Sequence, residues 1–258
     1  MSFTKDNRRF GGIARLYGEK FLEKIASVHV CVVGLGGVGS WVVEALARCG
    51  IGRLTLIDGD RVAVSNTNRQ LHALQGQYDE WKADMLAQRV HLIHPNCCVN
   101  VVRRFVRPDH MEELIPSDID ILVDCIDDLV GKVGLIVYAR TKGLPIFVSG
   151  GAGGKVDPGL IQVADMARIQ GDPLIGKIRS TLRREHGFPK GTQDGKGTLF
   201  GVTVVSSKEP MRQPTLRNNQ AIGAARGRRI GFGANVVVTG SVGLRIASCV
   251  LEYLRTRM

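Results

Sequence analysis

The chain has 258 residues, 44% of them hydrophobic, and a formal net charge of +11. Its length and apolar content support a sizeable buried core. The first thirty residues lack the apolar stretch of a secretory signal, and the six cysteines form no C-x-x-C pair. We therefore expect a cytoplasmic protein with reduced thiols and no zinc. The positive charge predicts attraction to a polyanion, either nucleic acid or an anionic membrane surface.

Short β-rich runs alternate with helical segments through the first 150 residues. We predict strands at 28–34, 53–58, 99–105, 119–126 and 144–150, and helices at 40–49, 81–93 and 130–142. This alternation predicts an α/β fold with a doubly wound, mainly parallel sheet. In such a Rossmann-like sheet, ligands bind at the carboxyl ends of the strands.

The second half is less regular. We predict strands at 160–165 and 201–207, a basic amphipathic helix at 173–185, a mobile loop at 186–200 and a basic crossover at 212–233. The last element, 234–254, is an apolar helix that approaches the length of a membrane span. Because Arg245 and Glu252 interrupt it, we expect a buried packing or dimer helix and no membrane anchor.

A glycine-rich turn, GLGGVGS, follows the first predicted strand. Gly34, Gly36 and Gly39 fit the pattern G-x-G-x-x-G. Glycine allows the backbone to approach a phosphate closely, and the next helix presents free N–H groups to the anion. The turn predicts a nucleotide site, and a turn that only packs helix against strand is the alternative.

The thirteen residues from Asp58 to Gln70 hold two aspartates, two asparagines, two arginines and a glutamine. Asp58 comes nineteen residues after Gly39, a spacing that suits a carboxylate bound to ribose hydroxyls. Arg69 can form a planar fork on phosphate oxygens, and Lys82 adds a compact charge. Together they suit a triphosphate, although Lys82 alone is equally typical of a solvated surface.

Acidic residues cluster at the end of the fourth predicted strand, in DCIDD. Asp124 lies near the strand end and Asp127 just beyond it. Such a carboxylate can hold magnesium or face phosphates. The alternative is that Asp127 or Asp128 caps the next helix. Lys132 follows closely enough to reach substrate or phosphate.

These elements, in this order, resemble the adenylating domain of the ubiquitin-activating and ThiF/MoeB-type enzymes over about residues 9–151. In that family a carboxylate attacks the α-phosphate of ATP. The resemblance implies a homodimer and a magnesium ion held by Asp127. It implies catalytic roles for Arg69, Lys82 and Asp127, and ATP contacts from Gly34, Gly36, Gly37, Gly39, Asp58, Asp60, Asn66 and Gln70.

Four further segments, 8–25, 149–158, 161–174 and 231–234, are similar to the tRNA threonylcarbamoyladenosine dehydratase subfamily. That resemblance implies a tRNA substrate whose threonyl carboxylate is adenylated. The carbamoyl group of the same side chain then captures it and expels AMP. Because the nucleophile belongs to the substrate, no catalytic cysteine is needed, and we expect Cys125 to be buried.

Two basic tracts gain a purpose from a tRNA substrate. The alternative is that both tracts are ordinary solvated surface. The tRNA-binding candidates in them are Lys177, Arg183, Arg184, Arg226, Arg228 and Arg229. We predict one adenylation-type domain over residues 1–258, with an ATP-binding core at 8–151 and a substrate-binding or dimerisation extension at 152–258. Docking of a sulphur-transfer protein partner stays open.

Two other functions use the same glycine turn. An activator of a sulphur-carrier protein ending in Gly-Gly usually carries paired zinc cysteines, which this sequence lacks. An NAD(P)-dependent oxidoreductase needs the aspartate that binds ribose, but it needs no added cations to hold a triphosphate. We rank both below the tRNA-modifying enzyme.

Overall fold

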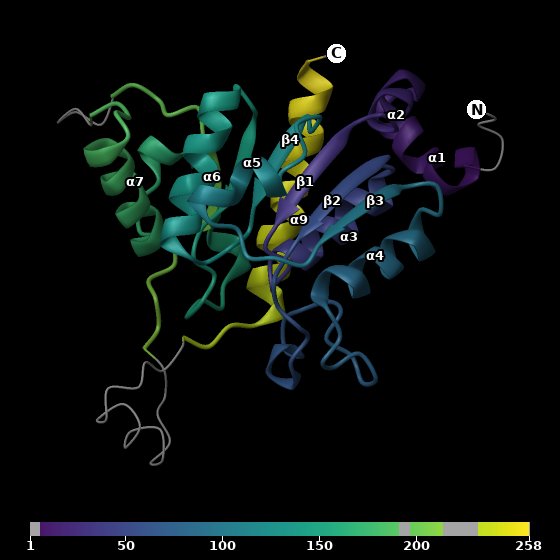
Figure 1. Ribbon diagram of the computed structural model, residues 1–258, viewed down its shortest axis with the longest axis horizontal. Helices are drawn as coiled ribbons and strands as arrows, with labels where there is room; N and C mark the ends of the chain where they lie inside the picture. The colour runs from purple at the N-terminus through teal and green to yellow at the C-terminus, as the bar shows by residue number, and fades with distance from the viewer. Residues whose placement is uncertain (1–5, 191–196, 214–231, 258) are drawn as a thin grey trace.

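The computed structural model describes residues 6–190, 197–213 and 232–257. Within them a seven-stranded sheet has the order β3-β2-β1-β4-β5-β7-β6 (Figure 1). Neighbouring strands are parallel except the last pair, β7 and β6. The doubly wound, mainly parallel fold predicted from the sequence is confirmed. The strands are β1 (His29–Val33), β2 (Arg53–Ile57), β3 (Cys98–Val102), β4 (Ile121–Asp124), β5 (Ile146–Ser149), β6 (Ile161–Asp165) and β7 (Thr203–Ser207).

Helices cover both faces of this sheet (Figure 1). Short 3-10 turns occur at Val64–Asn66, Pro108–His110, Pro158–Leu160 and Met166–Arg168. The α-helices are α1 (Asp6–Tyr17), α2 (Glu19–Ile25), α3 (Gly39–Cys49), α4 (Lys82–Ile93), α5 (Met111–Leu114), α6 (Leu129–Lys142), α7 (Pro173–Glu185) and α9 (Val236–Thr256). The sequence patterns had not predicted α1 and α2.

Alternation of side chains along the strands divides the core in two. Val30 and Val32 of β1 are buried in a cluster with residues of α1, α2, α3, α4 and α9. Cys31 and Val33 point the other way, into a cluster with residues of α5, α6 and α7. Because successive side chains of a strand face opposite sides, a strand that is covered on both faces is mostly apolar along its whole length. All five residues of β1 are buried accordingly.

Polar caps fix where several helices begin. The Asp128 side chain accepts a hydrogen bond from the N–H of Gly131 at the start of α6. Asp172 accepts from two N–H groups at the start of α7, and Asn235 accepts from Val238 at the start of α9. A short oxygen-bearing side chain satisfies N–H groups that a helix leaves unpaired. These caps set where α6, α7 and α9 meet the carboxyl edge of the sheet.

The C-terminal helix α9 packs as part of the core. Its length and composition would suffice to cross a membrane, yet half of its most apolar stretch is buried. Gly243 lies so close to α3 that a Cβ there would be 2.6 Å from the Val38 carbonyl oxygen. Val238, Val242 and Ile246 are buried in the same cluster as β1. The expected packing helix is therefore observed.

The strand order places an opening beside β1. The chain moves outward from β1 to β2 and β3, then returns to β4 on the other side of β1. The loops after β1 and β4 therefore diverge, which creates a crevice at the carboxyl edge. One predicted boundary was wrong there: β3 ends at Val102, not at Phe105, and the residues that follow it leave the sheet.

Candidate functional site

A cleft of about 1260 Å³ lies at this carboxyl edge. Its walls come from the ends of β1, β2, β4 and β5, the segment after β3, the start of α7 and residues near the start of α9. Ligand pockets usually measure roughly 300–1,000 Å³. The cleft therefore has room for a nucleotide and part of a second molecule.

At two positions of the glycine turn, Gly34 and Gly39, the packing leaves no room for a side chain. Gly34 has a φ of +85°, and a Cβ there would lie 2.7 Å from the Ile126 backbone nitrogen. A Cβ on Gly39 would lie 1.8 Å from the Gly34 carbonyl oxygen. Gly36 and Gly37 line the cleft. Gly39 thus holds the turn against the start of α3, while the other glycines form the surface that a phosphate can approach.

Asp58 closes the turn from the end of β2. One carboxylate oxygen accepts the Leu35 N–H at 2.6 Å and the other accepts the Asp60 N–H at 2.8 Å. Burial raises the pKa of Asp58, and the nearby Lys82 charge opposes that rise. Each oxygen keeps a lone pair, and Asp58 lines the cleft, so its geometry suits hydroxyl donors of a ribose.

Lys82 reaches the same wall from the first turn of α4. Its Nζ donates to Asp60 Oδ2 at 2.8 Å, and only 5% of the residue is exposed. The Asp60 side chain is 54% exposed, so this ion pair is half solvated. Lys82 is thus a buried cation at the surface of the cleft. It is not the solvated surface residue that the sequence left open as an alternative.

Arg69 lies at the opening, above Gly37. Its Nη1 donates to the Ser65 carbonyl and to Asn68 Oδ1, both at 3.0 Å. Trp41 of α3 donates to the Arg69 carbonyl at 3.1 Å, which fixes the backbone. An arginine has five N–H donors, so most of the guanidinium remains available to the cleft that it lines.

Asn66 and Gln70 support this segment from below. Asn66 Oδ1 accepts the Ala63 N–H at 3.0 Å and forms the cap of the short helical turn before Arg69. Gln70 is buried, and its Oε1 has no hydrogen-bond partner among the described residues. Both line the cleft. An unsatisfied buried acceptor favours a donor that arrives with a ligand or water.

The three aspartates at the end of β4 have different surroundings. Asp124 and Lys132 are both fully buried, and Lys132 Nζ lies 3.0 Å from Asp124 Oδ1. The expectation that Lys132 reaches substrate or phosphate was therefore wrong, because the pair lies beneath the cleft. Asp128 caps α6. Asp127 is exposed and lines the cleft, which leaves it as the carboxylate able to meet a cation.

The structure gives no support to a cysteine nucleophile. Cys125 lies beside Asp124 and lines the cleft half-buried, so the expectation that it is buried was wrong. Desolvation by its surroundings still raises its pKa to about 12. The thiol therefore stays protonated near neutral pH. Among the described residues, no group of histidine, cysteine, aspartate or glutamate side chains has the arrangement of a metal site.

The sequence patterns missed the part of the wall that lies beside Asp58. Arg104, Phe105 and Arg107 line the cleft because they follow β3, whose carboxyl end lies at the same edge. Lys155 and Asp172 line it from the other side. The signal for the first three was the position of β3 itself: residues directly after a parallel strand belong to the ligand edge.

A backbone junction at Gly154 closes the rim near α9. The Gly154 N–H donates to the Gly233 carbonyl at 2.6 Å, and the Arg212 N–H donates to the Gly154 carbonyl at 2.8 Å. Asn68 donates to the Ala234 carbonyl at 2.5 Å, so the polar segment before Arg69 also meets this rim. The phosphate side and the C-terminal side of the cleft are therefore linked directly.

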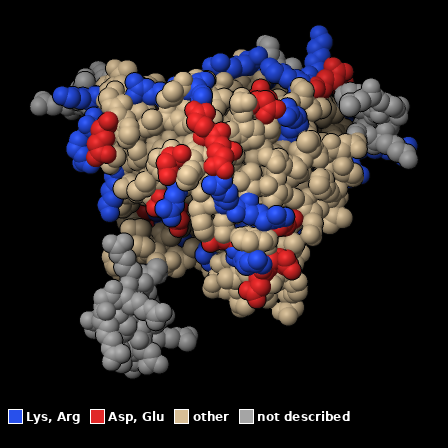
Figure 2. All heavy atoms as spheres, viewed as in Figure 1, with Lys and Arg blue, Asp and Glu red and all other residues tan. Residues whose placement is uncertain are grey.

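The predicted tRNA-binding residues fall into three places. Lys177 lines the cleft from α7. Arg183 and Arg184 line a separate hollow on the same helix, and Lys and Arg side chains gather along the edge where α7 lies (Figure 2). Outside the described residues lie Arg226, Arg228 and Arg229, together with residues 191–196 of the loop expected to be mobile.

Comparison with known proteins gives the site its context. A model of the ThiF family matches residues 11–194. The tRNA threonylcarbamoyladenosine dehydratase of Escherichia coli is 43% identical over 257 residues, covering 97% of this chain and 94% of that protein. The enzyme of the same name from Haemophilus influenzae is 40% identical over 247 residues, covering 96% and 93%.

A solved structure agrees with these relatives. The Escherichia coli dehydratase in complex with ATP matches with a TM-score of 0.86 at 42% identity, covering 97% of this chain and 95% of that one. The same enzyme has also been solved with AMP. Since the family model spans most of the chain and both relatives cover nearly all of it, the chain belongs to the ThiF family and is a homologue of its tRNA threonylcarbamoyladenosine dehydratases.

Proposed function

We propose that this protein is an ATP-dependent enzyme that dehydrates threonylcarbamoyladenosine in tRNA to a cyclic form. One observation carries the proposal. The cleft holds two cations suited to a triphosphate, Arg69 and Lys82, and still has room for a second substrate, in a chain about 40% identical to tRNA threonylcarbamoyladenosine dehydratases. ATP is the cosubstrate, in keeping with the ATP and AMP complexes of the relative.

ATP binding follows from the geometry of the cleft. The glycine turn and the first turn of α3 present backbone N–H groups to the phosphates. Asp58 holds the ribose through its free lone pairs. Lys82, already buried and charged, exchanges its exposed partner Asp60 for a phosphate at little cost. Arg69 adds a planar donor set from the opposite side.

Magnesium fits the remaining donor. Asp127 presents an exposed carboxylate to the cleft, and Mg²⁺ in nucleotide sites is usually held by one or two carboxylates, phosphates and water. When bound there, it would neutralise phosphate charge. Asp127 is the residue we assign to hold it, since Asp124 is paired with Lys132 and Asp128 caps α6.

Adenylation is the first chemical step. An oxygen of the threonyl carboxylate attacks the α-phosphorus of ATP, a P–O bond forms, and the bond to the pyrophosphate oxygen breaks. Lys82 and Arg69 stabilise the charge that gathers on the phosphate oxygens, and donors already held in place need no reorganisation when that charge develops. The products are an acyl-adenylate and pyrophosphate.

Cyclisation completes the reaction within the substrate. A nucleophilic atom of the carbamoyl group attacks the activated carbonyl carbon and closes a ring, and the carbamoyl N–H gives up its proton to solvent. The carbonyl–oxygen bond to AMP breaks, so one carboxylate oxygen leaves in AMP and the tRNA loses the elements of water. An intramolecular attack is favoured by proximity, which agrees with a protonated Cys125 that takes no part.

The proposal also includes a cytoplasmic location, a homodimer and tRNA binding through the basic tracts. The family resemblance supports the homodimer, and α9 leaves Val237 and Leu244 half exposed, at 53% and 51%. The molar mass in solution, measured by light scattering, tests it. A monomer at all concentrations would exclude the dimer without touching the chemistry. A sulphur-transfer partner stays a prediction.

One experiment tests the reaction. tRNA carrying threonylcarbamoyladenosine is incubated with the protein, ATP and magnesium, then digested and examined by mass spectrometry. We expect the modified nucleoside to lose one water while AMP and pyrophosphate form in equal amounts. ATP–pyrophosphate exchange stimulated by a Gly-Gly-tailed protein and not by this tRNA would instead favour a sulphur-carrier activator.

A further inference from the structure

A second buried lysine lines the cleft, and the binding of ATP described above does not use it. This residue is Lys155, which lies in the glycine-rich segment after β5. Only 2% of Lys155 is exposed, compared with 5% of Lys82. A lysine is almost never fully buried unless its charge has a partner. The group that Lys155 serves therefore has to be identified.

The two buried lysines lie on opposite sides of the cleft. Lys82 begins α4 and lies near Asp58, which follows β2. Lys155 Nζ donates to the carbonyl of Ser207, the last residue of β7, at 2.8 Å. In the sheet, β1, β4 and β5 lie between β2 and β7. Since the ribose and phosphates belong to the side of β1 and β2, Lys155 faces the part of the cleft that is left for the second substrate.

The ammonium group of Lys155 has unused donors. It carries three N–H groups, and the Ser207 carbonyl is the one hydrogen-bond acceptor that it meets among the described residues. Burial lowers the pKa of Lys155, and the nearby charges of Asp172 and Glu209 oppose that fall. Two N–H groups of a buried cation thus remain for a ligand.

The two nearby carboxylates are already engaged with the backbone. Asp172 caps α7, and its Oδ2 also accepts the Gly151 N–H at 2.9 Å. Glu209 Oε2 accepts the N–H groups of the two residues that follow Lys155, both at 2.8 Å. These contacts fix the segment that carries Lys155. The carboxylates therefore favour a charged lysine without occupying its free donors.

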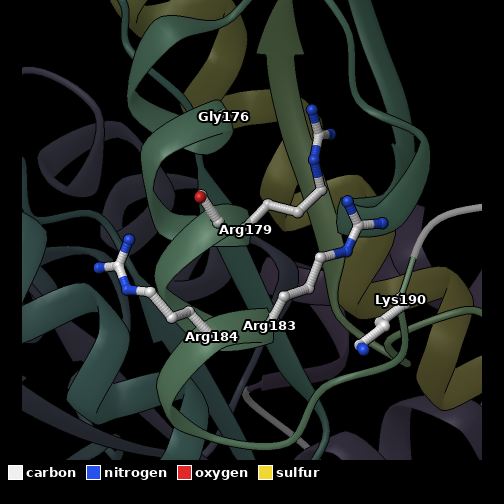
Figure 3. A pocket seen from close by; sticks show the side chains of 6 residues that line it. Gly176, Arg179, Arg183, Arg184 and Lys190 are labelled. Atoms are coloured by element: carbon white, nitrogen blue, oxygen red, sulfur yellow. The ribbon is translucent and has the colours of Figure 1, made fainter.

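The cations of α7 do not take the place of Lys155. Figure 3 shows Arg179 and Arg183 extending to one side of the helix and Arg184 to the other, and these arginines line a hollow separate from the cleft. Lys177 lines the cleft, but its side chain is exposed. An anion gains less from a solvated cation than from a buried one, because water screens the charge. Lys155 is thus the buried cation on the second-substrate side among the described residues.

We propose that Lys155 binds the threonyl carboxylate of the modified adenosine and holds it toward the α-phosphate of ATP. The carboxylate and the triphosphate are both anionic, so they repel each other when they share the cleft. A buried cation on the substrate side offsets this repulsion, and charge-assisted N–H···O bonds fix the orientation of the carboxylate. One carboxylate oxygen is held by Lys155, and the other is left to attack phosphorus.

This inference rests on the proposed function, because that function supplies the carboxylate. The test compares two anticodon stem-loop RNAs. One carries threonylcarbamoyladenosine, and the other carries the same residue with its carboxylate replaced by a neutral carboxamide. Affinity is measured by fluorescence anisotropy with an ATP analogue that has a methylene bridge between the α- and β-phosphorus atoms, so that no adenylate forms.

Two variants are compared with the wild type. Lys155→Met removes the charge and the N–H donors while keeping a long side chain. Lys208→Met is the matched control, because Lys208 follows Ser207 in the chain, is exposed and does not line the cleft. Both variants change the net charge by the same amount, so a general loss of attraction to RNA is equal in both.

We expect the wild type to bind the carboxylate RNA about ten-fold more tightly than the carboxamide RNA, as is typical of a hydrogen bond between charged groups. In Lys155→Met the two affinities should agree within about two-fold, because the cation that distinguishes them is gone. Lys208→Met should keep the full preference. All three proteins should bind the ATP analogue equally, since Lys155 does not contact the phosphates.

Three outcomes overturn the proposal. Equal affinity of the wild type for the two RNAs would do so without any variant, even if Lys155→Met failed to fold. A preference that persists in Lys155→Met would place the carboxylate elsewhere. Weaker binding of the ATP analogue by Lys155→Met would assign Lys155 to the nucleotide. If the preference depends on Lys155 as expected, yet ATP yields no dehydrated RNA, the proposed reaction fails and the carboxylate site stands.

Discussion

The buried pair of Asp124 and Lys132 offers the sharpest test of how this fold supports its cleft. Substitution Lys132→Met removes the cation but keeps a long apolar side chain. Asp124 then stays fully buried with no opposite charge, and its Oδ2 already lacks a partner among the described residues. Loss of one member of such a pair costs roughly 3–5 kcal/mol. For a domain of this size, that lowers Tm by about 10 °C.

The pH dependence of this loss has a definite sign. Burial raises the pKa of Asp124, and Lys132 opposes that rise. Without Lys132 the folded-state pKa moves further above the unfolded value of about 3.9. The neutral carboxyl therefore contributes stability that is complete below the unfolded pKa and is lost as pH rises through the folded pKa. The variant should be closer to wild type at about pH 5 than at about pH 8.

Urea unfolding followed by circular dichroism measures both effects. The double substitution Asp124→Leu with Lys132→Met should recover much of the loss, because an apolar pair leaves no buried charge. A single variant within about 1 kcal/mol of the wild type at both pH values would refute the reasoning, since it would mean that water reaches Asp124.

Four further predictions concern the cleft. Arg69→Ala and Lys82→Ala should each lower kcat/KM for adenylation by about 100-fold or more with an unchanged melting curve; wild-type turnover would remove their assigned roles. Gly39→Ala should cost about 3 kcal/mol of unfolding free energy because its Cβ would lie 1.8 Å from a carbonyl oxygen, whereas Gly36→Ala, with 3.7 Å to its nearest neighbour, should fold normally; equal stability of the two would contradict the packing argument. Asp58→Asn should raise the KM for ATP about ten-fold; because burial raises the pKa of Asp58, the wild-type KM should rise on mild acidification, while that of the Asn variant should not. Chelation of magnesium with EDTA should abolish pyrophosphate release, and added Mg²⁺ should restore it; full activity in EDTA would remove the metal role of Asp127.

The sheet could be predicted because its strands are buried on both faces. Runs such as those at 28–34 and 53–58 are mostly apolar and end in turns or polar residues, so the sequence indicated both that they are strands and their order along the chain. The helices α1 and α2 were missed, since α1 places charged and glycine residues among few apolar ones. Their burial depends on α3 and α4, which a local pattern does not report.

The site could be predicted from residues just after strands and from the polar segment that leads from β2 to α4. Asp58, Lys82, Arg69 and Asp127 all line one cleft, as their positions indicated. The burial of Lys132 was not predictable from spacing, because a lysine in the first turns of a helix faces solvent unless an acidic partner lies beneath it. Asp124 provides that partner. The wall at 104–107 was hidden for a different reason: the strand before it was predicted three residues too long.

The junction at Gly154 has a consequence for how homologues diverge. The chain departs at Arg212 and is back at Gly233, and both ends bond to the same glycine. Gly154 has a φ of +71°, a conformation that other residues rarely adopt, and a Cβ there would lie 3.1 Å from the Arg212 carbonyl oxygen. Homologues that keep this double fastening should therefore keep glycine at the position, because any other side chain would strain both ends of the rim at once.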